Sequence, residues 1–204
     1  MRIVHPYNPF YPLANTSTGL CFRQEPLYHF PDFEDEVSTE NNNLYCVLKN
    51  GAEVTASKIQ ESDKPLFVKF HTELSPATLI KRYQGKPSLE ERMGIHDSSA
   101  LTIVAKTKDA KTGKPIIIAE GSLHVQPYDK GIVEVGITIS DDFHSNGLGQ
   151  IMLSHLEDCA RRGGFRQIIG YVQDVNAPMM RIFKKAGYVF GFDIYHERVR
   201  KKEL

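Results

Sequence analysis

Two glycines, Gly147 and Gly149, stand where an alternating apolar segment gives way to a segment with helical periodicity. The first turn of a helix leaves backbone N–H groups without internal acceptors, and the helix dipole places partial positive charge there. Because glycines lack a Cβ, a phosphate can approach the backbone closely. Residues 140–150 therefore predict an anion site, in which several hydrogen bonds of about 1.5–3 kcal/mol each could hold a diphosphate without a lysine.

The residues around these glycines do not fit two common phosphate-binding motifs. A P-loop requires Lys and then Ser or Thr after its last glycine, whereas Gln150 and Ile151 follow Gly149. A dinucleotide-binding fingerprint requires a small residue at Met152 and a parallel strand before the turn. A tight helix entry without a ligand stays open as an alternative, because a G-x-G pattern alone is a weak signal.

The rest of the chain supplies the elements that must position this turn. Asn50-Gly51 between two short apolar runs predicts a β-hairpin, because both turn positions tolerate positive φ. Short turns at 109–113 and 127–131 separate three strand-like runs, which should therefore be antiparallel. The predicted strands are 45–48, 53–57, 100–105, 115–125, 131–140, 167–172 and 188–199, and the predicted helices are 64–70, 76–83, 89–93, 148–162 and 177–185. The basic tail 198–202 is expected to be a solvated end.

This order of elements defines an α+β fold with a mixed, mainly antiparallel sheet and helices on both faces. Residues 43–204 are expected to form one domain, long enough to bury a sizeable core. Residues 1–42 are expected to be an N-terminal arm of unknown role with little regular structure. Its scattered aromatic residues predict that it packs on the main domain or on a second subunit, so a homodimer is an open alternative.

Charge and cysteine content restrict the partners and the compartment. The 25 basic and 25 acidic residues balance, which argues against nucleic acid as a partner, since nucleic acids favour a clear basic excess. Cys21, Cys46 and Cys159 form no close pair, which indicates free thiols in a reducing compartment. No leader-like segment opens the chain, and no apolar run approaches the roughly 20 residues that span a bilayer. We therefore expect a cytoplasmic protein with no membrane partner and no metal site.

The glycine-containing turn resembles the Q/R-x-x-G-x-G/A motif of the GNAT superfamily of acyl-CoA N-acyltransferases. His144, Gly147 and Gly149 lie on that motif, with His144 in place of the usual Gln or Arg. The resemblance covers about residues 44–192. Further similar segments are Gly170–Val172, Asn176 and Phe183–Tyr188.

The resemblance implies acetyl-coenzyme A as co-substrate, bound mainly by main-chain groups. The residues implied at the diphosphate are His144, Ser145, Asn146, Gly147, Leu148, Gly149 and Gln150. The pantetheine arm would lie in a gap beside the strand 131–140. Ile137, Thr138 and Ile139 would supply its hydrogen bonds, with one N–H polarising the thioester carbonyl. Asn176 would bond the same arm, or would only cap the helix that follows it.

A narrower resemblance is to bacterial protein lysine acetyltransferases. Segment 73–83 is similar to their L-S-P-x-S-x-x-x-R-F sequence, and 134–137 is similar to their E-F-A-V strand. Glu134 stands where these enzymes have their general base. A lysine amine has a pKa near ~10.4 and arrives mostly protonated, so a carboxylate must accept its proton before attack. An exposed strand glutamate without a role is the alternative.

Two further positions bear on the chemistry. The superfamily often has a tyrosine seven residues after the asparagine, as the acid for the leaving thiolate, but Phe183 occupies that position here and cannot supply a proton. Water is expected to serve instead. Arg82 is expected either to line the acceptor side or to pair with an acid.

Taken together, these residues predict acetyl transfer from acetyl-CoA to a primary amine by direct attack. Cys159 lies on the apolar side of its helix, which argues against a covalent enzyme intermediate. By resemblance the acceptor is a protein lysine, and a small-molecule amine is the alternative within enzymes. A non-catalytic acyl-CoA sensor or regulatory domain also stays open.

Overall fold

The computed structural model describes residues 43–83, 85–97, 99, 101–193 and 198–204. The N-terminal arm at residues 1–42, and the packing predicted for its aromatic side chains, lie outside the described residues. The first residue of the predicted strand 100–105 and residues 194–197 of the predicted strand 188–199 also lie outside them.

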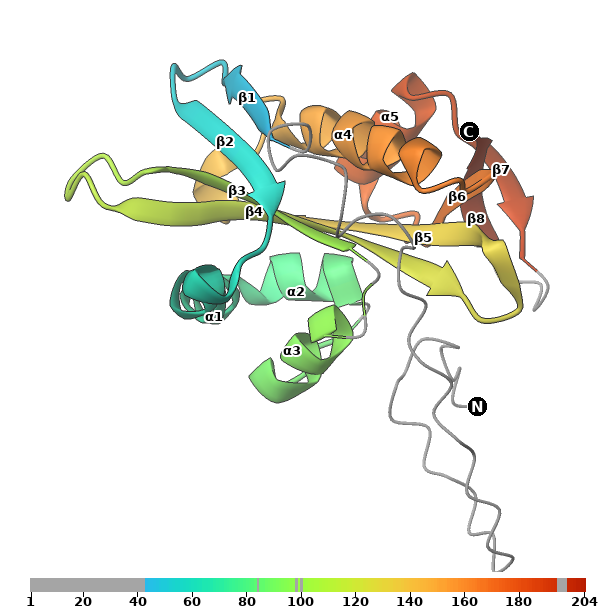
Figure 1. The fold of residues 1–204 in the computed structure, drawn as a ribbon, viewed down its shortest axis with the longest axis horizontal. Helices are drawn as coiled ribbons and strands as arrows, with labels where there is room; N and C mark the ends of the chain where they lie inside the picture. Colours follow the sequence, from blue (N-terminus) through green and yellow to red (C-terminus); the bar gives the residue numbers. More distant parts are fainter. Residues whose placement is uncertain (1–42, 84, 98, 100, 194–197) are drawn as a thin grey trace, which may run out of the picture.

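Within the described residues, one eight-stranded sheet forms the centre of the molecule (Figure 1). Its strand order is β1-β2-β3-β4-β5-β6-β8-β7, and every neighbouring pair is antiparallel except β5 with β6. The strands are β1 Leu44–Val47, β2 Glu53–Lys58, β3 Leu101–Lys108, β4 Pro115–Gln126, β5 Asp129–Ile139, β6 Gln167–Gly170, β7 Val189–Phe192 and β8 Arg198–Glu203. The predicted mixed, mainly antiparallel sheet is confirmed.

Helices cover both faces of this sheet, as predicted (Figure 1). One face carries α1 Lys64–Glu73, α2 Pro76–Tyr83 and α3 Leu89–Asp97, and the other carries α4 Leu148–Arg162 and α5 Ala177–Lys185. Short 3-10 turns, η2 Glu61–Asp63 and η3 Asp141–Phe143, precede α1 and follow β5. None of the helices in the described part of the chain combines the length and the hydrophobicity needed to cross a lipid bilayer.

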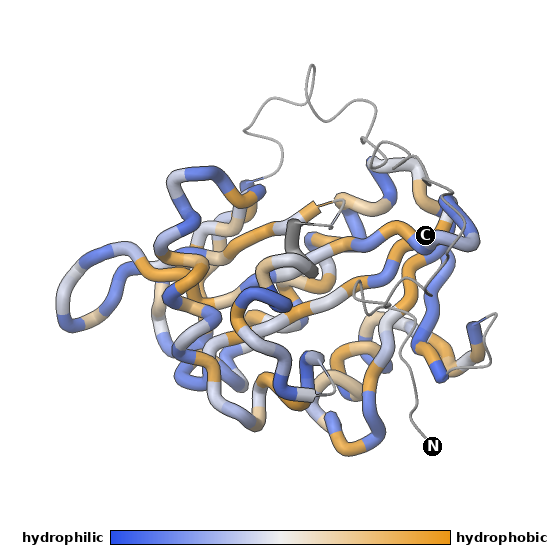
Figure 2. Tube along the Cα trace, turned by 90° about the horizontal axis from the view of Figure 1, so that it is seen from below, coloured by the Kyte–Doolittle hydropathy of each residue, from blue (hydrophilic) through white to orange (hydrophobic). Residues whose placement is uncertain are grey.

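The main core lies between the sheet and α4. Met152, Leu153 and Leu156 are fully buried there, each contributing about 1.5–3 kcal/mol by leaving water. Gly121 on β4 lets α4 approach closely, because an ideal Cβ there would lie 2.6 Å from Leu156 Cδ1. A smaller cluster around Phe67 and Phe70 packs α1 on the opposite face. In Figure 2, apolar segments run through the interior of the molecule and hydrophilic segments lie in the loops at its periphery.

The prediction for the C-terminal region is wrong in two respects. The single strand 188–199 is two strands, and the basic tail predicted as a solvated end forms β8, which pairs with β6 on one side and β7 on the other. The long stems of lysine and arginine can cover apolar surface while their charged ends reach water or a partner. The charge pattern alone therefore did not indicate a strand. Other boundaries shift by a few residues: α1 and α3 run further, to Glu73 and Asp97, and β6 ends earlier, at Gly170.

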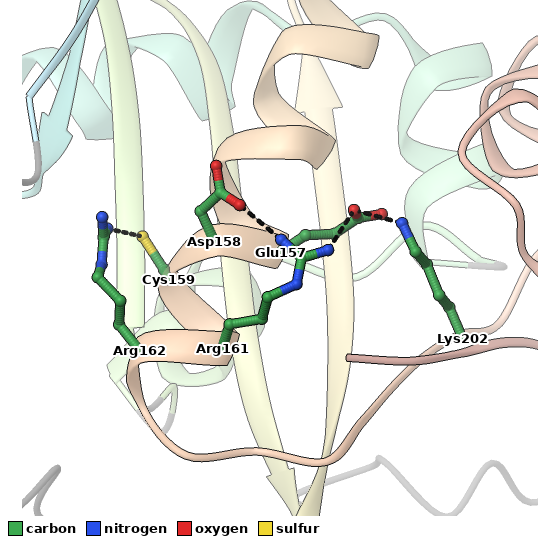
Figure 3. Close-up of polar contacts among 6 residues, drawn as sticks. All are labelled: Glu157, Asp158, Cys159, Arg161, Arg162 and Lys202. Carbon is green, nitrogen blue, oxygen red and sulfur yellow. Dashed lines mark hydrogen bonds and ion pairs between the residues drawn. The ribbon is translucent and has the colours of Figure 1, made fainter.

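Glu157 ties α4 to this inserted strand (Figure 3). Its carboxylate is buried and accepts a hydrogen bond from Lys202 Nζ at 2.7 Å, and it also lies 3.5 Å from Arg161 Nη2. The neighbouring Asp158 is exposed and pairs only with Arg161 among the described contacts (Figure 3). On the inner side of the helix, burial raises the pKa of the Cys159 thiol, which lies 3.4 Å from Arg162 Nη2.

Replacing Glu157 by alanine should lower the free energy of unfolding by about 1.5–3 kcal/mol, because Lys202 loses a charge-assisted bond in a largely buried place. Asp158→Ala is the matched control on the same helical turn. It should cost less than about 1 kcal/mol, because its ion pair is exposed. Urea unfolding of the two variants measures the difference. Equal midpoints would show that Glu157 does not fix β8.

Candidate functional site

A cleft of about 1500 Å³ opens where β5 and β6 part. Only Ile132–Glu134 of β5 pair with β6, where their partners are Gln167–Ile169. Beyond that point β6 ends at Gly170, whereas β5 continues to Ile139 with only β4 paired beside it. The gap expected from the family resemblance is therefore present, and the last residues of β5 line it.

All the site residues predicted from the sequence line this one cleft. They come from three parts of the chain: β5, the turn that leads into α4, and the start of α5. The residues are Glu134, Ile137, Thr138, Ile139, His144, Ser145, Asn146, Gly147, Leu148, Gly149, Gln150 and Asn176. Leu148 is almost fully buried, so mainly its backbone is available to a ligand.

The turn before α4 has a strained backbone that needs its glycine. Gly147 has φ +91° at the N-cap of α4, and Ser145 is the one described non-glycine residue with positive φ, at +64°. The Nε2 atom of His144 bonds the Ile139 carbonyl at 3.0 Å, and therefore carries the hydrogen as donor. His144 thus ties the turn to the end of β5, a role for which the family's usual Gln or Arg is not required.

Neighbouring elements hold the same turn from two other sides. The Asp141 carboxylate accepts hydrogen bonds from the Ser75 amide and hydroxyl and from the Thr78 hydroxyl, and so holds the start of α2, whose cap is the Ser75 hydroxyl. Burial alone would raise the pKa of Asp141, but these hydrogen bonds outweigh burial and hold it below its usual range. On the other side, the Lys49 amide lies 3.5 Å from the Asn146 carbonyl and joins the β1–β2 hairpin to the turn.

A row of polar side chains crosses β4 and β5 on the face that α1 and α2 cover. Glu120, Ser122 and His124 on β4 lie opposite Thr138, Gly136 and Glu134 on β5. The Thr138 hydroxyl donates to Glu120 at 2.6 Å, and Ser122 lies 3.1 Å from His124 Nε2. Sequence reasoning missed the β4 residues. The signal was present, because Glu120, Ser122 and His124 alternate within an otherwise apolar strand.

Arg82 reaches from α2 into this row. Its guanidinium lies 3.6 Å from the fully buried Glu120 and donates to Ser122 at 3.2 Å. Burial alone would lower the pKa of Arg82, but the charge of Glu120, with Tyr83 and Glu134, outweighs it and raises the pKa. Of the two alternatives for Arg82, the structure has the pairing with an acid, and Arg82 also lines the cleft.

Gly136 is what makes room for this guanidinium. An ideal Cβ at Gly136 would lie 2.1 Å from Arg82 Nη2. The room at Gly136 therefore comes from a close approach of Arg82 to β5 and not from a β-bulge. The β4–β5 register runs without a break through Gly136 and shifts only at Val125/Gln126.

Three residues on the other wall differ in what they can contribute. The Asn176 side-chain oxygen accepts a hydrogen bond from the Met179 amide at 3.4 Å, so it caps α5 while it lines the cleft. Phe183 is buried under the end of β6, where an ideal Cβ on Gly170 would lie 2.4 Å from its ring. Tyr171, which follows Gly170, donates its hydroxyl to Asp193 at 2.6 Å.

A mainly antiparallel sheet whose one parallel pair parts over a cleft, with a glycine-led helix at its edge, is the architecture of an N-acyltransferase. The sequence model of the Acetyltransferase (GNAT) family matches residues 58–188, and the chain belongs to this family. It is therefore an acyl-CoA-dependent N-acyltransferase, with acetyl-CoA as its co-substrate.

Individual relatives agree with this assignment. The acetyltransferase PA5475 of Pseudomonas aeruginosa is 29% identical over 158 residues, covering 74% of this chain and 83% of that protein. The GNAT domain of PAT from S. lividans has the same fold, with a TM-score of 0.66 at 20% identity, covering 82% of this chain and all of that one. A Sinorhizobium meliloti phosphinothricin acetyltransferase in complex with AcCoA has a TM-score of 0.56 at 18% identity, with coverages of 74% and 88%.

The glycine at the head of α4 should matter for coenzyme A binding beyond its effect on the fold. Gly147 and Gly164 lie at opposite ends of α4, and both have positive φ. An alanine Cβ at either position would have no neighbouring atom within 4 Å, so the two substitutions are matched. Each should lower stability by about 1–2 kcal/mol. Only Gly147→Ala should weaken coenzyme A binding, because only that turn lines the cleft. Titration calorimetry compares them, and equal affinities would remove the turn from the binding site.

Proposed function

We propose that this chain transfers an acetyl group from acetyl-CoA to the side-chain amine of a protein lysine, by direct attack, with Glu134 as the general base. The observation that carries the proposal is the position of Glu134. It is the last β5 residue paired with β6, at the point where the cleft opens, and it lines that cleft. Cys159, the alternative nucleophile, is buried in the core on α4.

Main-chain groups would bind two parts of the co-substrate, the diphosphate and the pantetheine arm. The amides at the head of α4 would hold the diphosphate, because the first turn of a helix offers donors and positive dipole charge. In the stretch His144–Gln150, the two end amides already bond the Asp141 and Gly147 carbonyls, so the amides between them would supply the donors. Ile137, Thr138 and Ile139 would bond the pantetheine arm along the part of β5 that β6 leaves uncovered. Asn176 would contribute from the start of α5, although its side-chain oxygen already caps that helix.

The polar row contains two carboxylates, and their environments distinguish their roles. Glu120 is completely buried and engaged by Thr138 and Arg82, so it cannot meet an incoming amine. Glu134 is only partly buried and lines the cleft. A carboxylate within hydrogen-bonding reach can take the proton of the ammonium, and the neutral amine then attacks the thioester carbon. Buried Glu120 instead balances the charge of Arg82.

The leaving thiolate needs no protein acid in this scheme. Phe183 cannot donate a proton, and the hydroxyl hydrogen of Tyr171 is already donated to Asp193. Thiols have pKa values near ~8.5, below the ~10.4 of a lysine amine, so the thiolate can leave and take a proton from water.

A protein lysine is favoured as acceptor by the likeness of segments 73–83 and 134–137 to protein lysine acetyltransferases. The fold shared with the GNAT domain of S. lividans PAT supports it. The free thiols of Cys46 and Cys159 support the inference of a reducing, cytoplasmic location. A small-molecule amine is the second candidate, because phosphinothricin acetyltransferases share the fold.

Glu134→Gln should lower kcat by about 10²–10⁴-fold while the affinity for acetyl-CoA stays within about 3-fold, because the amide cannot accept the proton. Glu73→Gln, an exposed change on α1, is the control and should behave like wild type. The assay follows free thiol release from acetyl-CoA with a lysine peptide, and calorimetry gives the affinity. Unchanged turnover would remove Glu134 as base. Tight binding by wild type with no release for any amine would support the sensor function instead.

Lysine in a peptide should be acetylated with a kcat/KM at least about 10-fold higher than phosphinothricin. The lysine amine ends a long apolar stem, whereas phosphinothricin carries a carboxylate on the carbon that bears its amine. Bringing that amine to Glu134 places two negative charges about 5 Å apart, at a cost on the order of 3 kcal/mol at an effective dielectric constant of about 20. The peptide has a blocked N-terminus and one lysine, and the same peptide with that lysine acetylated is the blank. A preference for phosphinothricin would overturn the lysine assignment.

A further inference from the structure

Tyr171 forms part of the wall across the cleft from the exposed part of β5. It follows the last residue of β6 and lines the cleft together with Glu134. Ile169, two residues earlier, is the β6 partner of Glu134 in the parallel pair. Side chains two residues apart along an extended strand share a face, so Tyr171 belongs to the same side of the sheet as Glu134.

The orientation of the Tyr171 hydroxyl is set by Asp193, which follows β7. The hydroxyl donates to Asp193 Oδ2 at 2.6 Å, the short distance expected of a bond to a carboxylate. Burial, then this bond, and then the charges of Tyr128, Asp193 and Glu134 raise the pKa of Tyr171, so it stays protonated at physiological pH. With its hydrogen committed to Asp193, the phenol oxygen can act toward a ligand only through its lone pairs.

We propose that the Tyr171 oxygen, oriented by Asp193, is the second acceptor for the ammonium group of the incoming amine, beside the Glu134 carboxylate. A primary ammonium has three N–H donors and no acceptor, so a site built from two acceptors selects it. Tyr171 is then a specificity-determining residue, and Asp193 is a positioning residue that acts through it. The inference rests on the proposed function, because it assumes that the amine arrives at Glu134.

The proton balance of the step is simple. One N–H proton of the ammonium passes to Glu134, and a second N–H keeps its hydrogen bond to the Tyr171 oxygen. The freed nitrogen lone pair forms the bond to the thioester carbon, the carbon–sulfur bond breaks, and the thiolate leaves. The acylated nitrogen then loses its third hydrogen as a proton to water, from which the thiolate takes a proton, and the neutral amide keeps one N–H. Tyr171 neither gains nor loses a proton, because its hydrogen stays on the bond to Asp193.

Tyr171→Phe removes the acceptor oxygen and keeps the ring. With the single-lysine peptide, KM for the amine should rise about 10-fold or more, since hydrogen bonds to charged groups contribute about 1.5–3 kcal/mol. KM for acetyl-CoA should stay within about 2-fold. Tyr45→Phe, at an exposed tyrosine on β1, is the matched control and should change neither constant. An unchanged KM for the amine, or an equal loss for both substrates, would overturn the proposal.

A double-mutant cycle tests whether Asp193 acts through Tyr171. Asp193→Ala should raise KM for the amine by a smaller factor, because the hydroxyl can then rotate and point its hydrogen at the ammonium. Asp193→Ala in the Tyr171→Phe background should add nothing, because the group that Asp193 orients is gone. If the two changes multiplied instead, Asp193 would have an independent role and the positioning assignment would be wrong.

A binding experiment separates this inference from the proposed function. Titration of n-butylammonium into the protein saturated with coenzyme A, followed by NMR, needs no turnover. Its dissociation constant should rise about 10-fold in Tyr171→Phe and stay unchanged in Tyr45→Phe. If wild type binds the ammonium in this way but acetylates no lysine peptide, the proposed function fails while the ammonium site stands. If Tyr171→Phe binds n-butylammonium as wild type does, the inference fails whatever the acetylation assay shows.

Discussion

The short parallel pairing between β5 and β6 is the constraint on which the site depends. Each strand in a sheet interior normally has both edges paired, because unpaired backbone groups away from water cost free energy. Here β5 stays paired with β4 over nearly its whole length, but it pairs with β6 only over Ile132–Glu134. The rest of its second edge pairs with no strand among the described residues, and an extended chain with amide groups, such as pantetheine, would satisfy those strand positions.

Contacts outside the gap hold the β5 wall in position. On the β5 side, Arg82 lies over Gly136 and pairs with Glu120, while Asp141, just after the strand ends, bonds the Ser75 hydroxyl at the start of α2. A buried ion pair contributes little net stability, because desolvation offsets most of the attraction. Its effect here is geometric. It fixes α2 against β5 and leaves Glu134 as the carboxylate of the polar row that meets the cleft.

The sequence predicted the features that depend on residues close together in the chain or on a family motif, and it missed those that depend on contacts between distant residues. The turn at Gly147, the hairpin at Asn50-Gly51 and the gap beside β5 have local or family-specific signals, and the structure has all three. The C-terminal strand β8 and its contact with Glu157 depend on which strand inserts between β6 and β7, and no local pattern encodes that choice. Likewise, the partner of Arg82 is distant in the chain. Only the alternation of Glu120, Ser122 and His124 indicated a polar row on β4.

The absence of a tyrosine at position 183 is coupled to the same gap. The Phe183 ring fills the space under Gly170, the residue at which β6 ends, so its tip lies against the Gly170 backbone at the edge of the cleft. A phenol oxygen added at that tip would extend into the space occupied at the end of β6 and would disturb the parting of the strands. A thiolate is a weaker base than the lysine amine and therefore the better leaving group. The absence of an acid therefore slows the reaction little. Tight packing at Gly170 is therefore compatible with turnover. Tyr171, the next residue along the chain, lines the cleft but keeps its hydroxyl hydrogen on Asp193, so it does not replace the missing acid.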